Sequence, residues 1–191
     1  MMKETPILMT PENAQKCHKG TKTQTRRIVK LPLRCPAHGV VLNSFDPRGE
    51  HDADILVNCP YGVVGDWLWV REPYAWPGEE VLLYRGCPSD SEIVEKWKHD
   101  KNCPQVKWTP SIHMPKWACR TWLEITEVRV QRLREISEED CYAEGLQRGM
   151  ADDRPDGLRI WYRELWESIN GPGSWDENPW VWAISFRKVA R

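Results

Sequence analysis

Apolar and polar residues alternate in four stretches of the chain, which is the pattern of strands that turn one face toward a core. These stretches are residues 25–29, 67–72, 122–130 and 180–187. Shorter apolar runs predict further strands at 40–42, 55–57 and 81–85. We expect the strand at 81–85 to pair with the strand at 67–72.

Helices are predicted where a capping residue precedes apolar residues spaced three and four apart. Thr10 is an N-cap candidate for a helix that should end at Gly20. Ser137 opens a second helix, and Glu144 lies near its end. Two more helices are expected, an amphipathic one from 158 to 170 and a shorter one at 91–99.

The predicted strands lie at both ends of the chain with helices between them, and they do not alternate with helices as in βαβ units. This order predicts an α+β fold with a barrel-like sheet of mixed strands, flanked by several helices. A length of 191 residues suits one domain that covers residues 1–191. The irregular stretches at about 30–60 and 86–115 are predicted to be insertions, and the tip of the second is a candidate lid.

The composition points to a cytoplasmic protein. The sequence has no apolar stretch long enough to cross a membrane, and its beginning lacks the basic-then-apolar pattern of a secretory signal. Seven scattered cysteines are an odd number and fit free thiols in a reducing compartment. A structural zinc site is the alternative for some of them, with the candidate ligands Cys35, His38, His51 and Cys59. The preferred interpretation includes no metal, no cofactor and no obligate protein partner.

Positive charge is concentrated in one segment, although the formal net charge of the chain is only -1. Between Asn13 and Phe45 there is no Asp or Glu, and the cations are Lys16, Lys19, Lys22, Arg26, Arg27, Lys30 and Arg34. A basic patch on a nearly neutral protein favours an anionic ligand such as a nucleotide or RNA.

Within this segment, Lys22 and Thr25 suit hydrolysis. A neutral lysine can take a proton while a hydroxyl, or a water that it holds, attacks a carbonyl. Residues three apart lie on opposite faces of a strand, so Lys22 and Thr25 can meet only across a bend near Gly20. The strand also places Arg27 on the face of Thr25 and Arg26 on the other face. Segments rich in Lys, Thr and Arg are also typical of solvated surface.

The chain has twelve tryptophans and only two phenylalanines. Those at alternating strand positions are expected in the core, namely Trp67, Trp69, Trp180 and Trp182. Those near prolines or turns could stack on a base, namely Trp76, Trp108, Trp117 and Trp175.

Several short motifs occur in order along the chain. They are Gly20-x-Lys22 with Arg27, Tyr61-Gly62-x-x-Gly65-Asp66-x-Leu68-Trp69-Val70-Arg71-Glu72, Ser111-Ile112-His113-Met114-Pro115-Lys116-Trp117-Ala118, Ile136-Ser137-Glu138-Glu139-Asp140 with Glu144-Gly145, Leu165-Trp166-x-Ser168-Ile169-Asn170-Gly171, and Asn178-Pro179-Trp180-Val181-Trp182. In these motifs the chain resembles the ASCH family of the PUA-like β-barrel superfamily, often associated with RNA, in an extended form found in phages and prophages.

The resemblance implies a reaction. The common ASCH signature has Glu where this chain has Thr25, and in this departure the chain is similar to bacterial N4-acetylcytidine amidohydrolases. Lys22, Thr25 and Glu144 then take the catalytic roles, and Glu138 or Glu139 could replace Glu144. The expected activity removes the acetyl group from N4-acetylcytidine or a related acylated cytosine nucleoside. The candidate substrate-binding residues are Arg26, Arg27, Trp69, Arg71, Glu72, His113 and Trp117.

Two other functions remain open from the sequence. One is an RNA-binding PUA-like module without catalysis, in which the basic segment follows phosphates and tryptophans stack on bases. The other is a metal-independent ribonuclease, in which Lys22 and His113 would stabilise charge at the scissile phosphate. The partner is therefore a modified nucleoside or an RNA.

Overall fold

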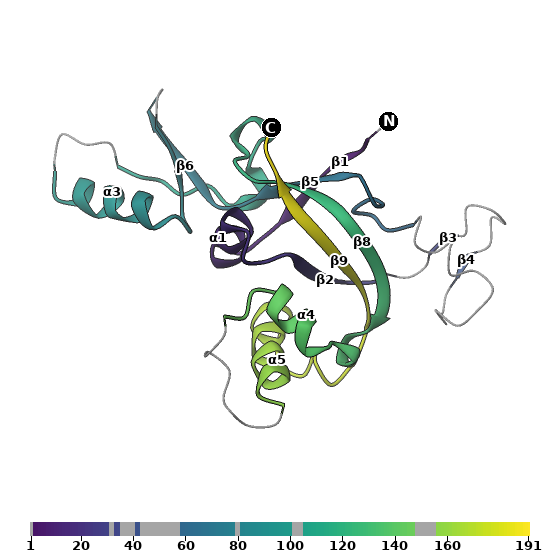
Figure 1. Cartoon of the computed structure of the whole chain (residues 1–191). Coiled ribbons are helices and arrows are strands. Elements are labelled where there is room, and N and C mark those ends of the chain that lie inside the picture. The colour runs from purple at the N-terminus through teal and green to yellow at the C-terminus, as the bar shows by residue number, and fades with distance from the viewer. Residues whose placement is uncertain are drawn as a thin grey trace.

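A computed structural model describes residues 2–30, 33–34, 41–42, 58–78, 81–100, 105–147 and 156–191. Its centre is a five-stranded mixed sheet with the strand order β1-β5-β8-β9-β2 (Figure 1). The strands are β1 (Glu4–Leu8), β5 (Trp67–Arg71), β8 (Trp122–Arg132), β9 (Trp180–Val189) and β2 (Gln24–Ile28). β1 and β5 are parallel, and the other pairs are antiparallel. The prediction of an α+β fold is confirmed.

The sheet curls strongly but is not a hydrogen-bonded ring. In the part of the chain described here, β1 and β2 are its two edges and do not pair with one another. A side chain bridges them instead, because Arg27 Nη2 of β2 donates to the carbonyl oxygen of Leu8 in β1 at 2.5 Å. One side of the barrel-like sheet is therefore open between these two strands.

Two apolar clusters hold the sheet and its helices together. The first fills the concave side of the sheet and includes Ile7, Leu68, Val70, Leu123, Ile125, Trp182 and Ile184. The second lies between β9 and the helices and includes Leu133, Ile136, Tyr162, Trp166 and Val181. Burying one large apolar side chain contributes about 1.5–3 kcal/mol, so these clusters supply most of the driving force for folding. β9 is buried on both faces because it contributes to both clusters.

The predicted helices form with the expected caps. α1 (Pro11–Lys19) begins after Thr10, whose hydroxyl accepts from the backbone N–H of Asn13 at 3.3 Å. α4 (Glu138–Ala143) begins after Ser137, whose hydroxyl accepts from the N–H of Asp140 at 3.1 Å. α5 (Gly157–Asn170) packs beside α4 (Figure 1). α4 also contacts β2, so the basic strand runs next to an acidic helix.

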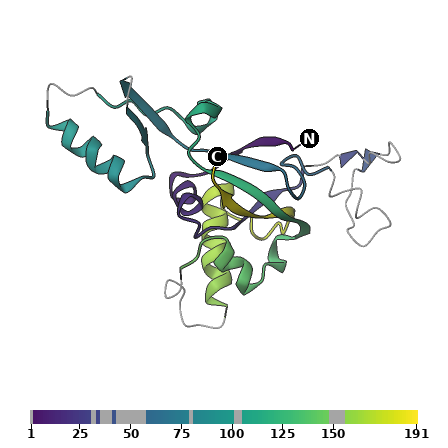
Figure 2. The ribbon, with the colours of Figure 1, turned by 45° about the horizontal axis from the view of Figure 1, so that its top comes forward.

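An arm extends from this body. It contains β6 (Tyr74–Gly78), β7 (Val81–Tyr84), α3 (Pro88–Lys98) and two single-turn helices at Ser111–His113 and Lys116–Ala118, and Figures 1 and 2 show β6, β7 and α3 reaching away from the sheet. The expected pairing of 81–85 with 67–72 is wrong, because β7 pairs with β6. The backbone groups of β7 pair with β6, the strand just before it in the sequence, while β5 already has β1 and β8 as neighbours.

Two smaller elements complete the description. β3 (Leu33–Arg34) and β4 (Val41–Leu42) form a separate short pair, and a single 3-10 turn at Leu133–Glu135 joins β8 to α4. The strand expected at 55–57 lies outside the described residues. In the described ranges, no helix combines the length and the apolar character that crossing a membrane requires.

Candidate functional site

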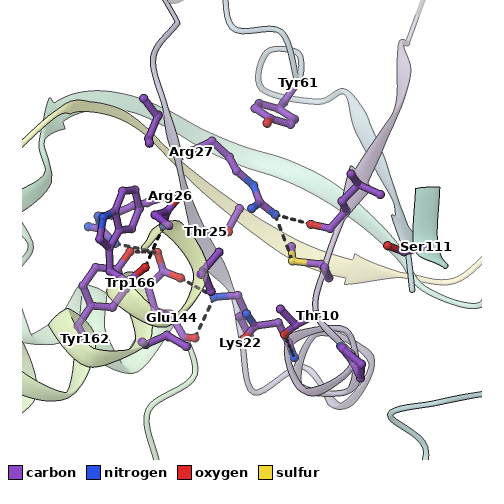
Figure 3. A pocket seen from close by; sticks show the side chains of 18 of the residues that line it. Thr10, Lys22, Thr25, Arg26, Arg27, Tyr61, Ser111, Glu144, Tyr162 and Trp166 are labelled. Carbon is purple, nitrogen blue, oxygen red and sulfur yellow. Dashed lines mark hydrogen bonds and ion pairs between the residues drawn. The ribbon is translucent and has the colours of Figure 1, made fainter. Parts of the chain in front are cut away.

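A cavity of about 520 Å³ opens where the sheet is not closed. Its walls come from both edge strands, from the start of α1, and from α4 and α5. Figure 3 shows Lys22, Thr25 and Arg26 in it, together with Glu144 and Tyr162. The volume falls within the range of about 300–1,000 Å³ that is usual for small-molecule sites. The cavity brings together all three residues that the sequence nominates for catalysis.

Lys22 makes an ion pair with Glu144 inside this cavity. Its Nζ donates to the carboxylate of Glu144 and, at 2.9 Å, to the backbone carbonyl oxygen of the same residue. Lys22 is 2% exposed and Glu144 is 3% exposed. Gly145, which follows Glu144, has φ 99°, a left-handed conformation that glycine adopts without strain. A Cβ there would be in ordinary contact with Cβ of Lys22 at 3.4 Å, and at 2.9 Å it would displace only the flexible side chain of Lys16.

Arg26 holds two carboxylates of α4 at once. Its Nη1 donates to Oε1 of Glu144 at 3.1 Å, and its Nη2 donates to Oδ2 of Asp140 at 2.5 Å. Asp140 and Glu144 are four residues apart, so they share one face of the helix. Gln24 joins the network, because its Nε2 donates to Oδ1 of Asp140 at 2.9 Å and its Oε1 accepts from Arg26 at 2.6 Å. Arg26 thus positions Glu144 through its terminal nitrogens, while its buried Nε has no hydrogen-bond partner in the described parts of the chain.

Tyr162 of α5 completes the surroundings of Glu144. Its hydroxyl donates to Oε1 of Glu144 at 3.3 Å, and its ring lies 5.6 Å from the guanidinium carbon of Arg26. Burial, and next the charge of Glu144, raise the pKa of Tyr162 well above its ordinary value, so the phenol remains a donor at neutral pH. Both carboxylate oxygens of Glu144 therefore accept hydrogen bonds from buried donors.

The pKa of Asp140 is lowered. Burial alone would raise it, but the hydrogen bond from Gln24 and the charges of Arg26 and Arg129 outweigh burial. Arg129 of β8 donates to Oδ1 of Asp140 at 2.8 Å. The ionised form is thus favoured by folding.

The lowered pKa of Asp140 predicts a pH-dependent contribution to stability. A carboxylate whose pKa is lower in the folded state stabilises that state above its unfolded pKa of about 4, and the contribution is lost as the pH falls through the folded pKa. We expect Asp140→Asn to lower the free energy of unfolding at neutral pH by about 1–3 kcal/mol, because Arg26 loses one buried partner and keeps Glu144. Urea unfolding from about pH 7 to about pH 3 should show this difference shrinking. A difference that stayed constant over this range would contradict the assignment.

Thr25 lines the same cavity from β2. It is buried, and among the described residues its hydroxyl has no hydrogen-bond partner. Among the same residues, the backbone N–H and C=O of Arg26, the next residue, are also free to bond to a ligand. In the β2–β9 ladder, Thr23 and Val29 bond to β9 through Phe186 and Trp180. Since these groups alternate in direction along a strand, the N–H and C=O of Arg26 face the open edge.

Five residues expected to bind substrate do not line this cavity. Glu72 is buried in a bidentate ion pair with Arg120 at 2.9 and 2.8 Å, and Arg71 donates to the carbonyl oxygen of Ile112. Trp69 lies on the face of β5 away from Leu68 and Val70, with Arg71 over its ring. His113 and Trp117 are exposed on the arm. His113, which the ribonuclease interpretation pairs with Lys22, is not among the residues that line the cavity of Lys22.

Four residues of the site were missed by the sequence interpretation, namely Gln24, Tyr61, Asp140 and Tyr162. Two signals could have identified part of this set. Gln24 and Arg26 lie on the same face of a strand, and Asp140 lies four residues before Glu144. A cation on one face of a strand and two carboxylates on one face of a helix can pair in a buried network when the two elements pack together.

A metal site has no support in the described ranges, where no group of three or more His, Cys, Asp or Glu side chains could hold a metal ion. Cys59 is a buried free thiol. The other three candidate zinc ligands, Cys35, His38 and His51, lie outside those ranges.

Comparison with solved structures finds similar chains, among them two bacterial proteins. A scan of family models and a search of curated proteins both find no match. An ASCH domain from Lactobacillus crispatus JV V101 is similar with a TM-score of 0.43 and 11% identity, over 97% of this chain and 79% of that one. Protein EF3133 from Enterococcus faecalis V583, of the family DUF984, has a TM-score of 0.42 and 13% identity, over 99% and 81%. One of the two is thus from the family that the sequence motifs resemble. Similarity this low assigns no activity to this chain.

Proposed function

We propose that the protein is an amidohydrolase that removes the acetyl group from N4-acetylcytidine or a related acylated cytosine nucleoside. The observation that carries the proposal is the buried Lys22–Glu144 ion pair in a cavity that also contains the unpartnered hydroxyl of Thr25. A base, an acid and a nucleophile are the groups that hydrolysis of an amide needs. The motif resemblance to N4-acetylcytidine amidohydrolases, and the basic segment, support this class of substrate.

The reaction begins with a proton transfer within the ion pair. A nucleoside that fills the cavity displaces water, which disfavours two separated charges and favours movement of a proton from Lys22 Nζ to Glu144. Neutral Lys22 then takes the proton of Thr25, or of a water held by Thr25, as that oxygen bonds to the acyl carbon. Glu144 gives its proton to N4 of cytosine as the C–N bond breaks, because this nitrogen leaves poorly unless protonated.

The products balance the reactants. If Thr25 is the nucleophile, cytidine leaves first and the acetyl group stays on Thr25 as an ester. A second proton transfer from Lys22 to Glu144 then frees Lys22 to take a proton from a water that attacks the ester. Glu144 returns its proton to the Thr25 oxygen, and acetate and a proton are released. The sum is one water consumed for one amide cleaved.

The open edge of β2 supplies a donor that can stabilise the negative charge of the tetrahedral intermediate. The N–H of Arg26 directly follows Thr25 and faces the cavity, so it can donate to the oxygen that becomes negative in the tetrahedral intermediate. A backbone N–H in this place does not depend on a flexible side chain. Tyr61 and Trp166, which also line the cavity, are the aromatic candidates for contact with the pyrimidine in place of Trp69 and Trp117.

Substitutions of Thr25 test the role of its hydroxyl. Thr25→Val keeps the shape of the side chain and removes the hydroxyl, and we expect it to reduce the turnover number by about 10²–10⁴-fold. Thr25→Ser should retain much of the activity, since it keeps the oxygen. The measurement is cytidine released from N4-acetylcytidine, separated by liquid chromatography. Equal turnover by the wild type and Thr25→Val would remove Thr25 from the mechanism.

RNA binding without chemistry is the second candidate, and one feature of the arm favours it. Trp76 and Trp117 are 55% and 61% exposed, and their rings meet edge to face at 5.0 Å. Exposed aromatic pairs of this kind can stack on unpaired bases. Affinity for RNA that follows phosphates should fall steeply with salt, whereas hydrolysis of an uncharged nucleoside should not.

A further inference from the structure

A second cavity, of about 460 Å³, lies on the other side of the α1 N-terminus from the first. Pro11 belongs to the walls of both cavities, which makes them neighbours. The second cavity is lined by Lys16 and Lys19 of α1, by Arg85 and Gly86 where β7 ends, and by Gln147 after α4. The mechanism above uses none of these residues.

Positive charge dominates this cavity. Lys16, Lys19 and Arg85 face a single carboxylate in its walls, that of Glu12. Within the described part of the chain, none of the three cations has a salt bridge. In the first cavity, Lys22 and Arg26 are paired with carboxylates, whereas Arg27 and Lys30 have no salt bridge among the described residues.

The electrostatics of Lys16 agree with this uneven distribution. Its pKa is lowered, first by burial and then by the charge of Lys22, while Glu12 opposes the shift. A half-buried ammonium that feels more positive than negative charge gains stability when an anion approaches. The stem of Lys16 is also held in place, because its Nζ lies 5.7 Å from the ring centre of Trp161.

The arm is built to approach α1 closely at this point. A Cβ on Gly86 would lie 2.2 Å from the carbonyl oxygen of Pro11, so only glycine permits the contact. This contact brings Arg85, at the root of the predicted second insertion, next to the lysines of α1. Two segments that are far apart in sequence therefore combine their cations around one cavity.

We propose that the second cavity is a phosphate-binding subsite for a nucleotide or an RNA strand whose acylated cytosine occupies the first cavity. The assignment of the base to the first cavity rests on the proposed function. Phosphate is the anion of choice here because two ammonium groups and a guanidinium surround the cavity, and a guanidinium can bind phosphate oxygens in bidentate fashion. Lys22 and Arg26, which pair with carboxylates, would then serve catalysis, and the cations of the second cavity would bind phosphate.

Binding of unacylated ligands tests the subsite independently of hydrolysis. We would measure dissociation constants for cytidine, cytidine 5′-monophosphate and a short oligocytidine RNA by isothermal titration. The double variant Lys19→Gln, Arg85→Gln should weaken binding of a phosphate-bearing ligand by about tenfold or more, while Lys107→Gln, an exposed lysine of the arm, should leave it unchanged. For RNA, loss of two phosphate contacts should also lower the salt slope of log K by about 1.4.

The two sources of phosphate give different patterns, and each would support the subsite. If the subsite holds a mononucleotide, the double variant should bind cytidine 5′-monophosphate more weakly and keep the wild-type salt slope for RNA. If the subsite holds an RNA strand, the double variant should show the lower salt slope. If the double variant and Lys107→Gln bind every phosphate-bearing ligand equally, the subsite does not exist. Failure of the wild type to hydrolyse N4-acetylcytidine would count against the proposed function and would leave this comparison intact.

Discussion

Lys22→Met is expected to reduce turnover of N4-acetylcytidine by about 10²–10⁴-fold, because it removes the group that accepts the attacking proton. Methionine has a similar unbranched shape, and the other partners of Glu144, Arg26 and Tyr162, remain in place. The loss should therefore appear in the turnover number of a folded protein. Initial rates over a range of substrate concentrations, with circular dichroism to confirm folding, measure it.

A small amine offers a sharper test of the same role. Lys22→Ala leaves space where the ammonium was, and added ethylamine or propylamine should restore part of the turnover if Lys22 acts by carrying a proton. Lys107→Ala, which removes an exposed lysine of the arm, is the matched control and should keep wild-type activity. Wild-type turnover by Lys22→Ala without added amine would rule out proton transfer through this residue.

Glu144→Gln is expected to have the largest effect on stability, in addition to loss of activity. Lys22 and Arg26 both pair with this carboxylate, and an amide of the same shape leaves the buried ammonium of Lys22 without a counter-charge. Removing one partner of a buried ion pair typically costs about 3–5 kcal/mol. Urea unfolding near neutral pH should show a lower midpoint with an unchanged slope.

Glu139→Gln is the matched control for Glu144→Gln. Glu139 is an exposed residue in the first turn of the same helix and was an alternative candidate for the catalytic acid. Its substitution should change the free energy of unfolding by no more than about 0.5 kcal/mol and leave turnover intact. If Glu139→Gln abolished turnover while Glu144→Gln did not, the catalytic acid would be misassigned.

Much of the secondary structure could be predicted from the sequence, because side-chain periodicity reports on burial directly. β8, β9 and α5 follow their apolar patterns, and α1 begins and ends at the residues that cap it. Strand pairing was harder, since alternation shows which face is buried but not which neighbour a strand takes. The partner of β7 was wrong for this reason.

The residues of the candidate site also divide into those that the sequence could predict and those that it could not. Lys22 and Thr25 are close in sequence, so a bend after α1 was enough to place them together, and Glu144 came from the family resemblance. Tyr162 carries no such signal, and Asp140 shows only its spacing of four residues from Glu144. An acid in the first turn of a helix looks like a response to the helix dipole, and a tyrosine in an amphipathic helix looks like packing.

Tryptophans illustrate the limit of composition. Trp182 is buried as its strand pattern predicted, whereas Trp175, expected near a turn and available for stacking, is also buried. Trp117 is exposed, but it lies on the arm and not at the first cavity. The position of a tryptophan relative to a turn therefore did not predict whether it is buried, because burial depends on how segments distant in sequence pack together.

Cytidine formation from N4-acetylcytidine is the most direct test of the proposed chemistry. The purified wild-type protein, without added cofactor, should release cytidine and acetate in equal amounts, and Lys22→Met and Glu144→Gln should release both at least about 100-fold more slowly. If the wild type forms no cytidine, or if all three proteins form it equally, the Lys22–Glu144 pair is not the machinery of an amidohydrolase.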